Sequence, residues 1–228
     1  MAARVNLHDV IQWEVRSWSR VLPLWERHLP AQRPARFLGI GEREGGLSLW
    51  FASLGHDVLC TDLRPFPPAT RALHERNGLA ERIRYDQADA TALPYPEGSF
   101  DGVFFKSVIG ALGSKERQQQ AIAEMHRVLK PGGVLYFAEN LHGTWLHQWL
   151  RKRFVSWNVY WRYLDVEADS DLFSPFTRLE GRTTGLLANL GRSEGQRDML
   201  ARVDPALVQV LPRSMHAIWY GVAIKDRS

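Results

Sequence analysis

The chain has 228 residues, of which 45% are hydrophobic and 24% charged, as in soluble globular proteins that bury a full core. The length fits one α/β domain covering residues 1–228, and no shift in composition marks a second domain. The net charge of +4 is spread along the chain without a block of like charge, so nothing calls for a nucleic-acid partner.

Targeting signals and disulfides are not expected. No hydrophobic run approaches the ~18 residues of a membrane span, and the N-terminus lacks the apolar stretch of a signal peptide. Cys60 is the only cysteine, so no disulfide can form within the chain, and its apolar neighbours indicate a buried side chain. We therefore expect a cytoplasmic protein. The sequence indicates no oligomeric state.

Helical and strand patterns then follow in chain order. Residues 1–34 predict a helical extension, with an apolar stripe over residues 7–29 and a kink or break at Pro23. Apolar runs predict strands at residues 36–40, 57–62, 83–85, 100–105, 134–138, 176–183 and 215–224. Helical periodicity predicts helices at residues 47–54, 66–77, 114–129, 146–163 and 194–201.

This alternation predicts the fold. It is typical of an α/β protein with a Rossmann-like doubly wound sheet, mostly parallel with an antiparallel last strand, plus N-terminal helices. Residues 35–140 would form a cofactor-binding half and residues 141–228 a substrate-side half.

The segment FLGIGEREGGLSLW, residues 37–50, predicts a strand that enters a helix through a glycine-bearing turn. Its glycines allow a sharp turn and close approach of a ligand; they are Gly39, Gly41, Gly45 and Gly46. Glu42 and Glu44 would repel the pyrophosphate of a dinucleotide, which argues against a nicotinamide-dependent oxidoreductase. They suit the sulfonium and ammonium groups of S-adenosylmethionine, although both side chains could equally point to solvent.

Asp62 ends the second predicted strand, 21 residues after Gly41. At this place a carboxylate can accept hydrogen bonds from both ribose hydroxyls of a nucleoside cofactor. The alternative role, capping the following helix, is disfavoured because Pro65, Pro67 and Pro68 delay that helix.

Four segments together resemble the class I S-adenosylmethionine-dependent methyltransferases. They are FLGIGEREGGLSLWFASLG, VLCTDL, QADATALPYPEGSFDGVFF and HRVLKPGGVLYFAEN, in the order and spacing of that family, within residues 36–140. The segment FFKSVIGALG and the tail from WRYL to YGVAIK are similar to bacterial members associated with polysaccharide and secondary-metabolite biosynthesis.

The resemblance implies S-adenosylmethionine as the cofactor and a set of residues that hold it. The turn at Gly39, Gly41 and Gly45 would lie under the methionine part, and Lys106 would contact methionine or substrate. Asp62 would bind the ribose and Asp89 the adenine amino group. Leu63 and Ala90 would flank the adenine ring.

Two positions depart from the family pattern. The family usually has an acidic residue at the place of Gly39 and a glycine at the place of Arg43. Arg43 must therefore point away from the cofactor, or the pocket is reshaped. Glu42 or Glu44 would have to supply the missing carboxylate. The alternative is a non-catalytic protein that binds a cofactor or a partner through a degenerate turn.

His142, just after the fifth strand, is the predicted general base. A hydroxyl acceptor needs a group to take its proton, and an unperturbed imidazole titrates near neutrality. Its alternative role is to cap the next helix. The expected acceptor is a hydroxyl or amine of a small molecule or a glycan. No metal site is expected, because His142 and His147 are five residues apart and no cysteine or aspartate cluster accompanies them.

Residues 145–163 combine four tryptophans with basic side chains, and three interpretations stay open. Trp145 and Trp149 share one helix face, as do Trp157 and Trp161. A core-packing helix would bury at least half of them. A substrate lid would stack them on sugars or flat rings. A helix lying on a membrane surface would make a peripheral membrane contact.

Overall fold

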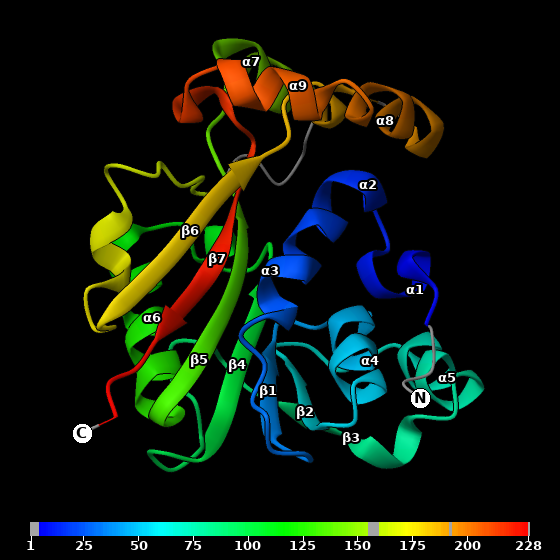
Figure 1. Ribbon diagram of the computed structural model, residues 1–228, viewed down its shortest axis with the longest axis vertical. Helices are drawn as coiled ribbons and strands as arrows, with labels where there is room; N and C mark the ends of the chain where they lie inside the picture. Colours follow the sequence, from blue (N-terminus) through cyan, green and yellow to red (C-terminus); the bar gives the residue numbers. More distant parts are fainter. Residues whose placement is uncertain (1–4, 155–159, 192, 228) are drawn as a thin grey trace.

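A seven-stranded sheet forms the centre of the protein. The computed structural model describes residues 5–154, 160–191 and 193–227. The strand order is β3-β2-β1-β4-β5-β7-β6, and β7 alone runs opposite to the other six strands (Figure 1). The strands are β1 Arg36–Ile40, β2 Asp57–Asp62, β3 Ile83–Gln87, β4 Phe100–Lys106, β5 Leu129–Asn140, β6 Arg178–Thr184 and β7 Ile218–Ile224.

Nine α-helices are present in the described parts of the chain. They are α1 Leu7–Ile11, α2 Val15–Trp18, α3 Leu22–Glu26, α4 Gly46–Ser53, α5 Pro68–Arg76, α6 Lys115–Val128, α7 Trp145–Phe154, α8 Glu194–Ala201 and α9 Asp204–Val210. Short 3-10 turns are η1 Ser19–Val21, η2 Ala80–Arg82, η3 Ile109–Leu112, η5 Ser170–Phe173, η6 Ala188–Leu190 and η7 Arg213–Met215. Within these described ranges, no helix is long and apolar enough to cross a membrane.

The helices make three groups around the sheet (Figure 1). Helices α3 and α4 pack on one face, where Trp25, Phe37 and Phe51 belong to one buried cluster. Helix α6 covers the other face, and its Ile122 and Met125 belong to a second cluster. Helices α7, α8 and α9 lie together beyond the carboxyl ends of the parallel strands. This places a separate layer above the edge where doubly wound sheets bind ligands.

The predicted fold class is confirmed, including the reversed final strand. The prediction of a helix over residues 146–163 was too long. Helix α7 comprises Trp145–Phe154, residues 155–159 lie outside the described residues, and residues 160–163 are not helical. Helix α9 was not predicted.

The N-terminal segment forms short helices, with a boundary at Pro23 as predicted and further breaks before it. Pro23 lies in the first turn of α3, where its missing N–H costs nothing, so it begins a helix and does not kink one. The further breaks come earlier, at Gln12 with φ of 73° and Glu14 with φ of 47°. These two left-handed residues turn the chain so that residues 11–18 lie near the carboxyl end of β4.

Candidate cofactor and acceptor site

The glycine turn joins β1 to α4 with two residues in left-handed conformation. Gly41 has φ of 65°, and Gly45, the N-cap of α4, has φ of 72°. A Cβ atom on Gly41 would stand 2.6 Å from the Val108 side chain, and one on Gly45 would stand 2.6 Å from the His74 ring. Both positions therefore require glycine for backbone and for space.

Glu42 points into the protein, whereas the two residues that follow it, Arg43 and Glu44, are exposed. Its Oε2 accepts hydrogen bonds from the backbone N of Ser48 at 2.8 Å and from Ser48 Oγ at 3.1 Å. Its Cγ lies 2.8 Å from the place that a Cβ on Gly39 would take. The Glu42 side chain thus fills the space beside Gly39, while Arg43 and Glu44 are on the surface.

The buried Glu42 carboxyl group and the half-buried Lys106 ammonium group interact at this turn. Burial raises the pKa of Glu42 to about 7, against the opposing effects of the Ser48 hydrogen bonds and the charge of Lys106. Burial likewise lowers the pKa of Lys106 to about 8, while Glu42, Glu44 and Glu14 act to raise it. The turn therefore carries a carboxylate that titrates near neutrality and responds to any nearby cation.

A hydrogen-bond chain from α5 holds the turn in place. The carbonyl of Gly45 accepts from His74 Nε2 at 2.8 Å, and the Tyr85 hydroxyl donates to His74 Nδ1 at 2.5 Å. Burial lowers the pKa of His74, which favours the neutral ring that this chain needs. Thr70 Oγ1 adds a hydrogen bond of 2.8 Å to the carbonyl of Arg43. Sequence reasoning missed these supports, because they come from residues far along the chain.

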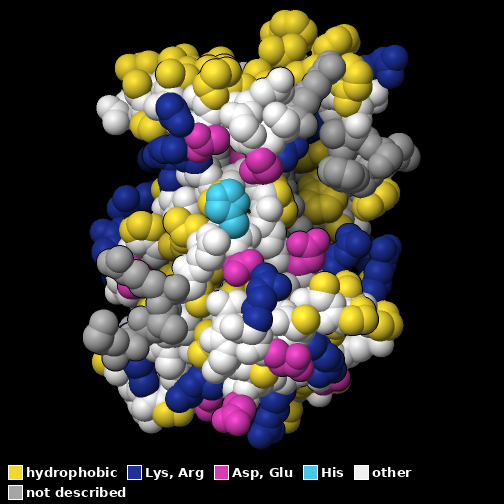
Figure 2. All heavy atoms as spheres, turned by 90° about the vertical axis from the view of Figure 1, so that its right-hand side faces the viewer, with side chains coloured by type: hydrophobic (Ala, Val, Ile, Leu, Met, Phe, Trp, Pro, Cys, Tyr) yellow, Lys and Arg dark blue, Asp and Glu magenta, His cyan; other side chains and the backbone are white. Residues whose placement is uncertain are grey.

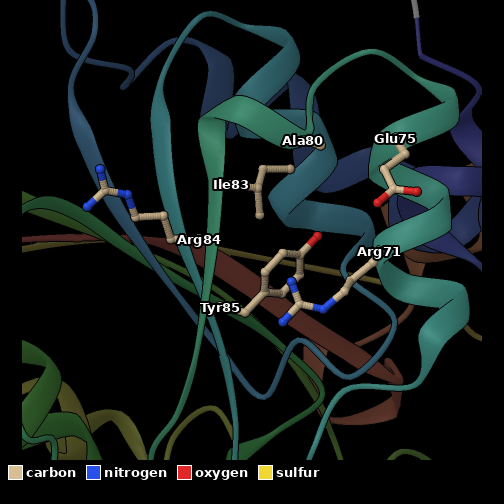
Figure 3. A pocket seen from close by; sticks show the side chains of 6 residues that line it. All are labelled: Arg71, Glu75, Ala80, Ile83, Arg84 and Tyr85. Carbon is tan, nitrogen blue, oxygen red and sulfur yellow. The ribbon is translucent and has the colours of Figure 1, made fainter.

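The outer end of this chain borders a surface depression of about 330 Å³ (Figure 3). The Arg71 guanidinium lies 4.1 Å from the centre of the Tyr85 ring there. The depression is lined by Arg71, Glu75, Ala80, Ile83, Arg84 and Tyr85, along the edge strand β3. It contains none of the predicted site residues, so we assign it no ligand.

Asp62 and Leu63 lie together at the carboxyl end of β2. Asp62 Oδ1 accepts from the backbone N of Arg64 at 2.9 Å, and within the described chain Oδ2 makes no hydrogen bond. Leu63 is 60% exposed, an unusual position for a large apolar side chain beside a carboxylate. A carboxylate with an open oxygen and an uncovered apolar surface match a ribose and an adjoining flat ring.

Asp89 and Ala90 follow β3 at the same edge. Asp89 Oδ1 accepts from the backbone N and the Oγ1 of Thr91, both at 2.8 Å, and the backbone bond is the largest cause that lowers the Asp89 pKa. Ala90 is 8% exposed. The carboxylate is thus held ionised in a fixed orientation, with an oxygen left for a ligand donor.

Residues of the N-terminal segment cover Lys106 at the end of β4. The sequence did not predict this cover. Lys106 Nζ donates to the carbonyl of Ile11 at 2.7 Å. The same ammonium lies 4.3 Å from the Trp13 ring centre and 5.5 Å from that of Trp18. Two aromatic faces and a carbonyl therefore surround the cation at this end of the site.

Glu14 is a second buried carboxylate beside this cover. Its left-handed backbone is unusual for a residue other than glycine, and its backbone N donates to both carboxylate oxygens of Glu194, at 3.1 and 3.0 Å. Its Oε1 has no hydrogen-bond partner among the described residues. Burial raises the Glu14 pKa to about 7. Glu14 therefore combines an unusual backbone conformation with a buried oxygen that lacks a partner among the described residues.

Glu139 and Ser107 shape the loop after β4. Glu139 Oε2 accepts from the backbone N of Val108 at 2.8 Å and of Gly110 at 3.3 Å. Ser107 has φ of 57°, and its Oγ accepts from Asn140 Nδ2 at 2.7 Å. Burial raises the pKa of Glu139. The Glu139 carboxylate thus fixes the backbone of this loop.

His142 lies after β5 on an exposed turn. Its backbone N donates to the carbonyl of Leu164 at 3.0 Å, and its ring centre is 6.1 Å from that of Tyr163. Burial, followed by the charge of Arg151, lowers the His142 pKa. It does not cap α7, because Thr144 Oγ1 accepts from the first-turn N of His147 at 3.4 Å. Within the described residues, no contact joins His142 to the glycine turn.

The tryptophans of α7 are outside the core, so the core-packing interpretation was wrong for them. Trp145 is 77% exposed and Trp149 is 54% exposed, because α7 turns His147 inward, where its Nε2 bonds the carbonyl of Leu186 at 2.6 Å. Trp161 is half-buried, and Trp157 lies outside the described residues. In the described parts, no group of residues could hold a metal ion.

The fold and the site define a class of protein. A doubly wound sheet with a glycine turn after β1 and aspartates at the carboxyl ends of β2 and β3 is typical of folds that bind a nucleoside cofactor at this edge. Residues 38–137 match the family described as a methyltransferase domain. Residues 38–137 thus carry a methyltransferase domain, and the chain is similar to S-adenosylmethionine-dependent methyltransferases.

Curated relatives share part of the chain. A malonyl-[acyl-carrier protein] O-methyltransferase of Enterobacter lignolyticus is 31% identical over 69% of this chain and 56% of its own length. A ubiquinone/menaquinone biosynthesis C-methyltransferase of a Marinomonas species is 31% identical over 51% of this chain and 48% of its own. The chain thus spans about half the length of these relatives.

Solved structures share the fold. A phosphoethanolamine N-methyltransferase 2 of Haemonchus contortus, in complex with S-adenosyl-L-methionine, superposes with a TM-score of 0.66 at 23% identity. The superposition covers 92% of this chain and 53% of that protein. At this identity the likeness describes the fold and does not transfer an acceptor.

Proposed function

We propose that the protein is a methyltransferase that uses S-adenosylmethionine and acts on a hydroxyl or amine of a small molecule or a glycan. The observation that carries the proposal is the Glu42 carboxylate, buried in the space beside Gly39. The two departures in the glycine turn argued for a non-catalytic protein. The inward Glu42 and the exposed Arg43 argue against that alternative.

The residues present fit this cofactor. Glu42 would face the methionine ammonium, Asp62 would bind the ribose, and Asp89 the adenine amino group, with Leu63 and Ala90 on either side of the ring. S-adenosylmethionine would supply a methyl group activated by a sulfonium. Charge disperses during methyl transfer, so the protein's main tasks are to orient the acceptor and to exclude water.

The chain's own residues would perform those tasks at the carboxyl ends of β4 and β5. Trp13 and Trp18 cover Lys106 and limit the access of water to this end. We propose His142 as the general base for a hydroxyl acceptor, because its lowered pKa keeps the ring neutral near pH 7. The relatives are named for O-, C- and N-methyl transfer, so their names do not choose the attacking atom.

Calorimetric titration of the purified protein with S-adenosylmethionine, S-adenosylhomocysteine and NADH tests the proposal. We expect micromolar binding of the two adenosyl ligands and none of NADH. Binding of NADH alone would indicate an oxidoreductase. If none of the three ligands binds, the non-catalytic alternative is favoured. The single buried cysteine is compatible with a cytoplasmic location, which we also propose.

A further inference from the structure

The outer surface of the α7–α9 layer is rich in uncovered hydrophobic side chains. Among the described residues, ten large hydrophobic side chains are exposed, and six of them belong to this layer. These six are Trp145, Trp149 and Phe154 of α7, Met199 of α8, Val203 after it and Val210 of α9. Figure 2 shows hydrophobic side chains gathered along the top of the molecule, over these helices. We call this surface the apolar cap.

Helix α7 is amphipathic with its aromatic face turned outward. Trp145, Trp149 and Lys152 follow one another at four and three residues, so they share one face, and all three are exposed. The opposite face is fixed to the protein, because His147 is buried and Arg151 Nη1 bonds the carbonyls of Leu141 and His142 at 2.7 and 3.0 Å. The tryptophans cannot turn inward without breaking these bonds.

The charge of α7 is entirely positive. Residues 145–154 contain no aspartate or glutamate, and three basic residues, Arg151, Lys152 and Arg153, follow one another. Lys152 and Arg153 are exposed and form no salt bridge with any described residue. Tryptophan and phenylalanine next to exposed lysine and arginine are the composition of helices that lie in the interface of an anionic bilayer.

We propose that the apolar cap docks on the surface of an anionic lipid bilayer. The tryptophans would enter the headgroup region while Lys152 and Arg153 meet lipid phosphates. A second copy of the chain is a poorer occupant, because symmetric pairing would bring the positive α7 helices together. The proposal goes beyond methyl transfer and does not depend on it, since the cofactor titration tests the proposed function separately.

The apolar cap lies at the end of the sheet where we place the acceptor. The layer lies beyond the carboxyl ends of the parallel strands (Figure 1), and Lys106 is the last residue of β4 while His142 follows the end of β5. Its inner side touches the acceptor end directly, through the bonds of Arg151 to the backbone of residues 141–142. Docking would thus hold this end of the sheet close to the lipid surface.

Cosedimentation of the whole protein with vesicles tests the proposal. One set of vesicles contains phosphatidylcholine alone, and the other contains phosphatidylcholine and phosphatidylglycerol in equal parts. We expect sedimentation with the anionic vesicles, and weakening as salt is raised, because surface charge attraction is screened. Trp145→Ser/Trp149→Ser and Lys152→Glu/Arg153→Glu should each lower the affinity by roughly tenfold or more.

A matched control removes the same kinds of side chain elsewhere. Arg178→Glu/Leu179→Ser changes two exposed residues at the start of β6, at the other end of the sheet, and should leave vesicle binding unchanged. All substituted positions are exposed, and circular dichroism would verify folding. The proposal is overturned if anionic vesicles bind no better than neutral ones, or if the tryptophan variant binds like the parent. A tryptophan variant that instead converts a dimer to a monomer, without vesicle binding, would assign the apolar cap to self-association.

Discussion

The Glu42 side chain occupies the space that a side chain on Gly39 would need. A Cβ atom on Gly39 would stand 2.8 Å from Glu42 Cγ, and 2.6 Å from the buried ring of Phe104. The family places its acidic side chain at the position of Gly39. Here Glu42, three residues later, brings a carboxylate side chain into the space beside Gly39, so it makes up for the acidic residue that is missing at position 39.

Placing a side chain back on Gly39 should therefore destabilise the fold. We expect Gly39→Ala to lower the free energy of unfolding by ~1–3 kcal/mol, the usual cost of overpacking a core. Denaturant unfolding measures the change. Gly195→Ala, in the first turn of α8, is the control. Nothing lies within 4 Å of a Cβ at that position and alanine favours the helix, so this change should leave the free energy of unfolding unchanged or raise it by up to about 1 kcal/mol.

Coupling between the two positions is the sharper test of compensation. In Gly39→Ala/Glu42→Ala the alanine no longer competes with the glutamate, although it still meets Phe104. The double variant should be more stable than the sum of the single effects predicts, by ~0.5 kcal/mol or more. Strict additivity would show that the two side chains do not share one space.

Ionisation of Glu42 should control cofactor affinity. Its pKa is raised to about 7 by burial, and the carboxylate form is the one that attracts a cationic ligand. The affinity for S-adenosylmethionine should thus rise roughly tenfold between about pH 6 and about pH 8, as the carboxylate becomes ionised. Lys106, with a pKa near 8, and Asp62 are the other charged groups that face it.

Two variants isolate this effect in calorimetric titrations. Glu42→Gln should bind more weakly at high pH and lose most of the pH dependence, because the amide cannot ionise. Glu44→Gln changes an exposed neighbour of the same charge and should retain the dependence of the parent. A pH profile that Glu42→Gln leaves unaltered would exclude this carboxylate as the cation partner.

The affinity for S-adenosylmethionine should depend on Asp62, the proposed partner of the ribose hydroxyls. Asp62→Ala is expected to weaken S-adenosylmethionine binding by at least ~1 kcal/mol, the scale of a hydrogen bond to a charged group. Asp57→Ala, at the exposed start of the same strand, is the control. Equal affinities for the Asp62 variant and the parent would contradict the ribose assignment.

His142→Ala should leave cofactor affinity nearly intact while it lowers turnover.

The sequence predicted the sheet well because strand signals are local. Apolar runs identify β1 and β2 without knowledge of their partners, and alternation with helices fixes the parallel topology. The inward turn of Glu42 is different in kind. It depends on the absence of a Cβ at Gly39 and on the neighbouring strand β2, whose Thr61 carbonyl accepts a hydrogen bond from the Glu42 backbone N at 2.9 Å. Sequence left Glu42 and Glu44 as equal candidates for this reason.

The cover over Lys106 escaped prediction for a similar reason. Residues 11–18 reach β4 because Gln12 and Glu14 adopt left-handed conformations that neither residue type favours. In the same way, the period of the α7 tryptophans predicted a shared face but not its direction. That direction follows from His147 and its bond to Leu186, a residue of the substrate-side half.

Glu14 provides the last test, through the dependence of stability on pH. Burial raises its pKa from 4.5 to about 7 in the folded protein, although Ser17 and Arg197 oppose the shift and Asp204 and Glu194 add to it. The folded state thus holds a proton that the unfolded chain releases at lower pH. The stability that this proton contributes is complete below about pH 4.5 and is lost as the pH rises through about 7.

Glu14→Gln should remove this loss, because an uncharged side chain of the same size needs no ionisation. At about pH 8.5 we expect the variant to be more stable than the parent by roughly 1–3 kcal/mol, and at about pH 4 the two should be nearly equal. Denaturant unfolding at both pH values measures the difference. Glu26→Gln changes an exposed residue of α3 and should give no such pH-dependent difference in stability. If the Glu14 variant is less stable than the parent at both pH values, a charged Glu14 stabilises the folded protein and the burial argument fails.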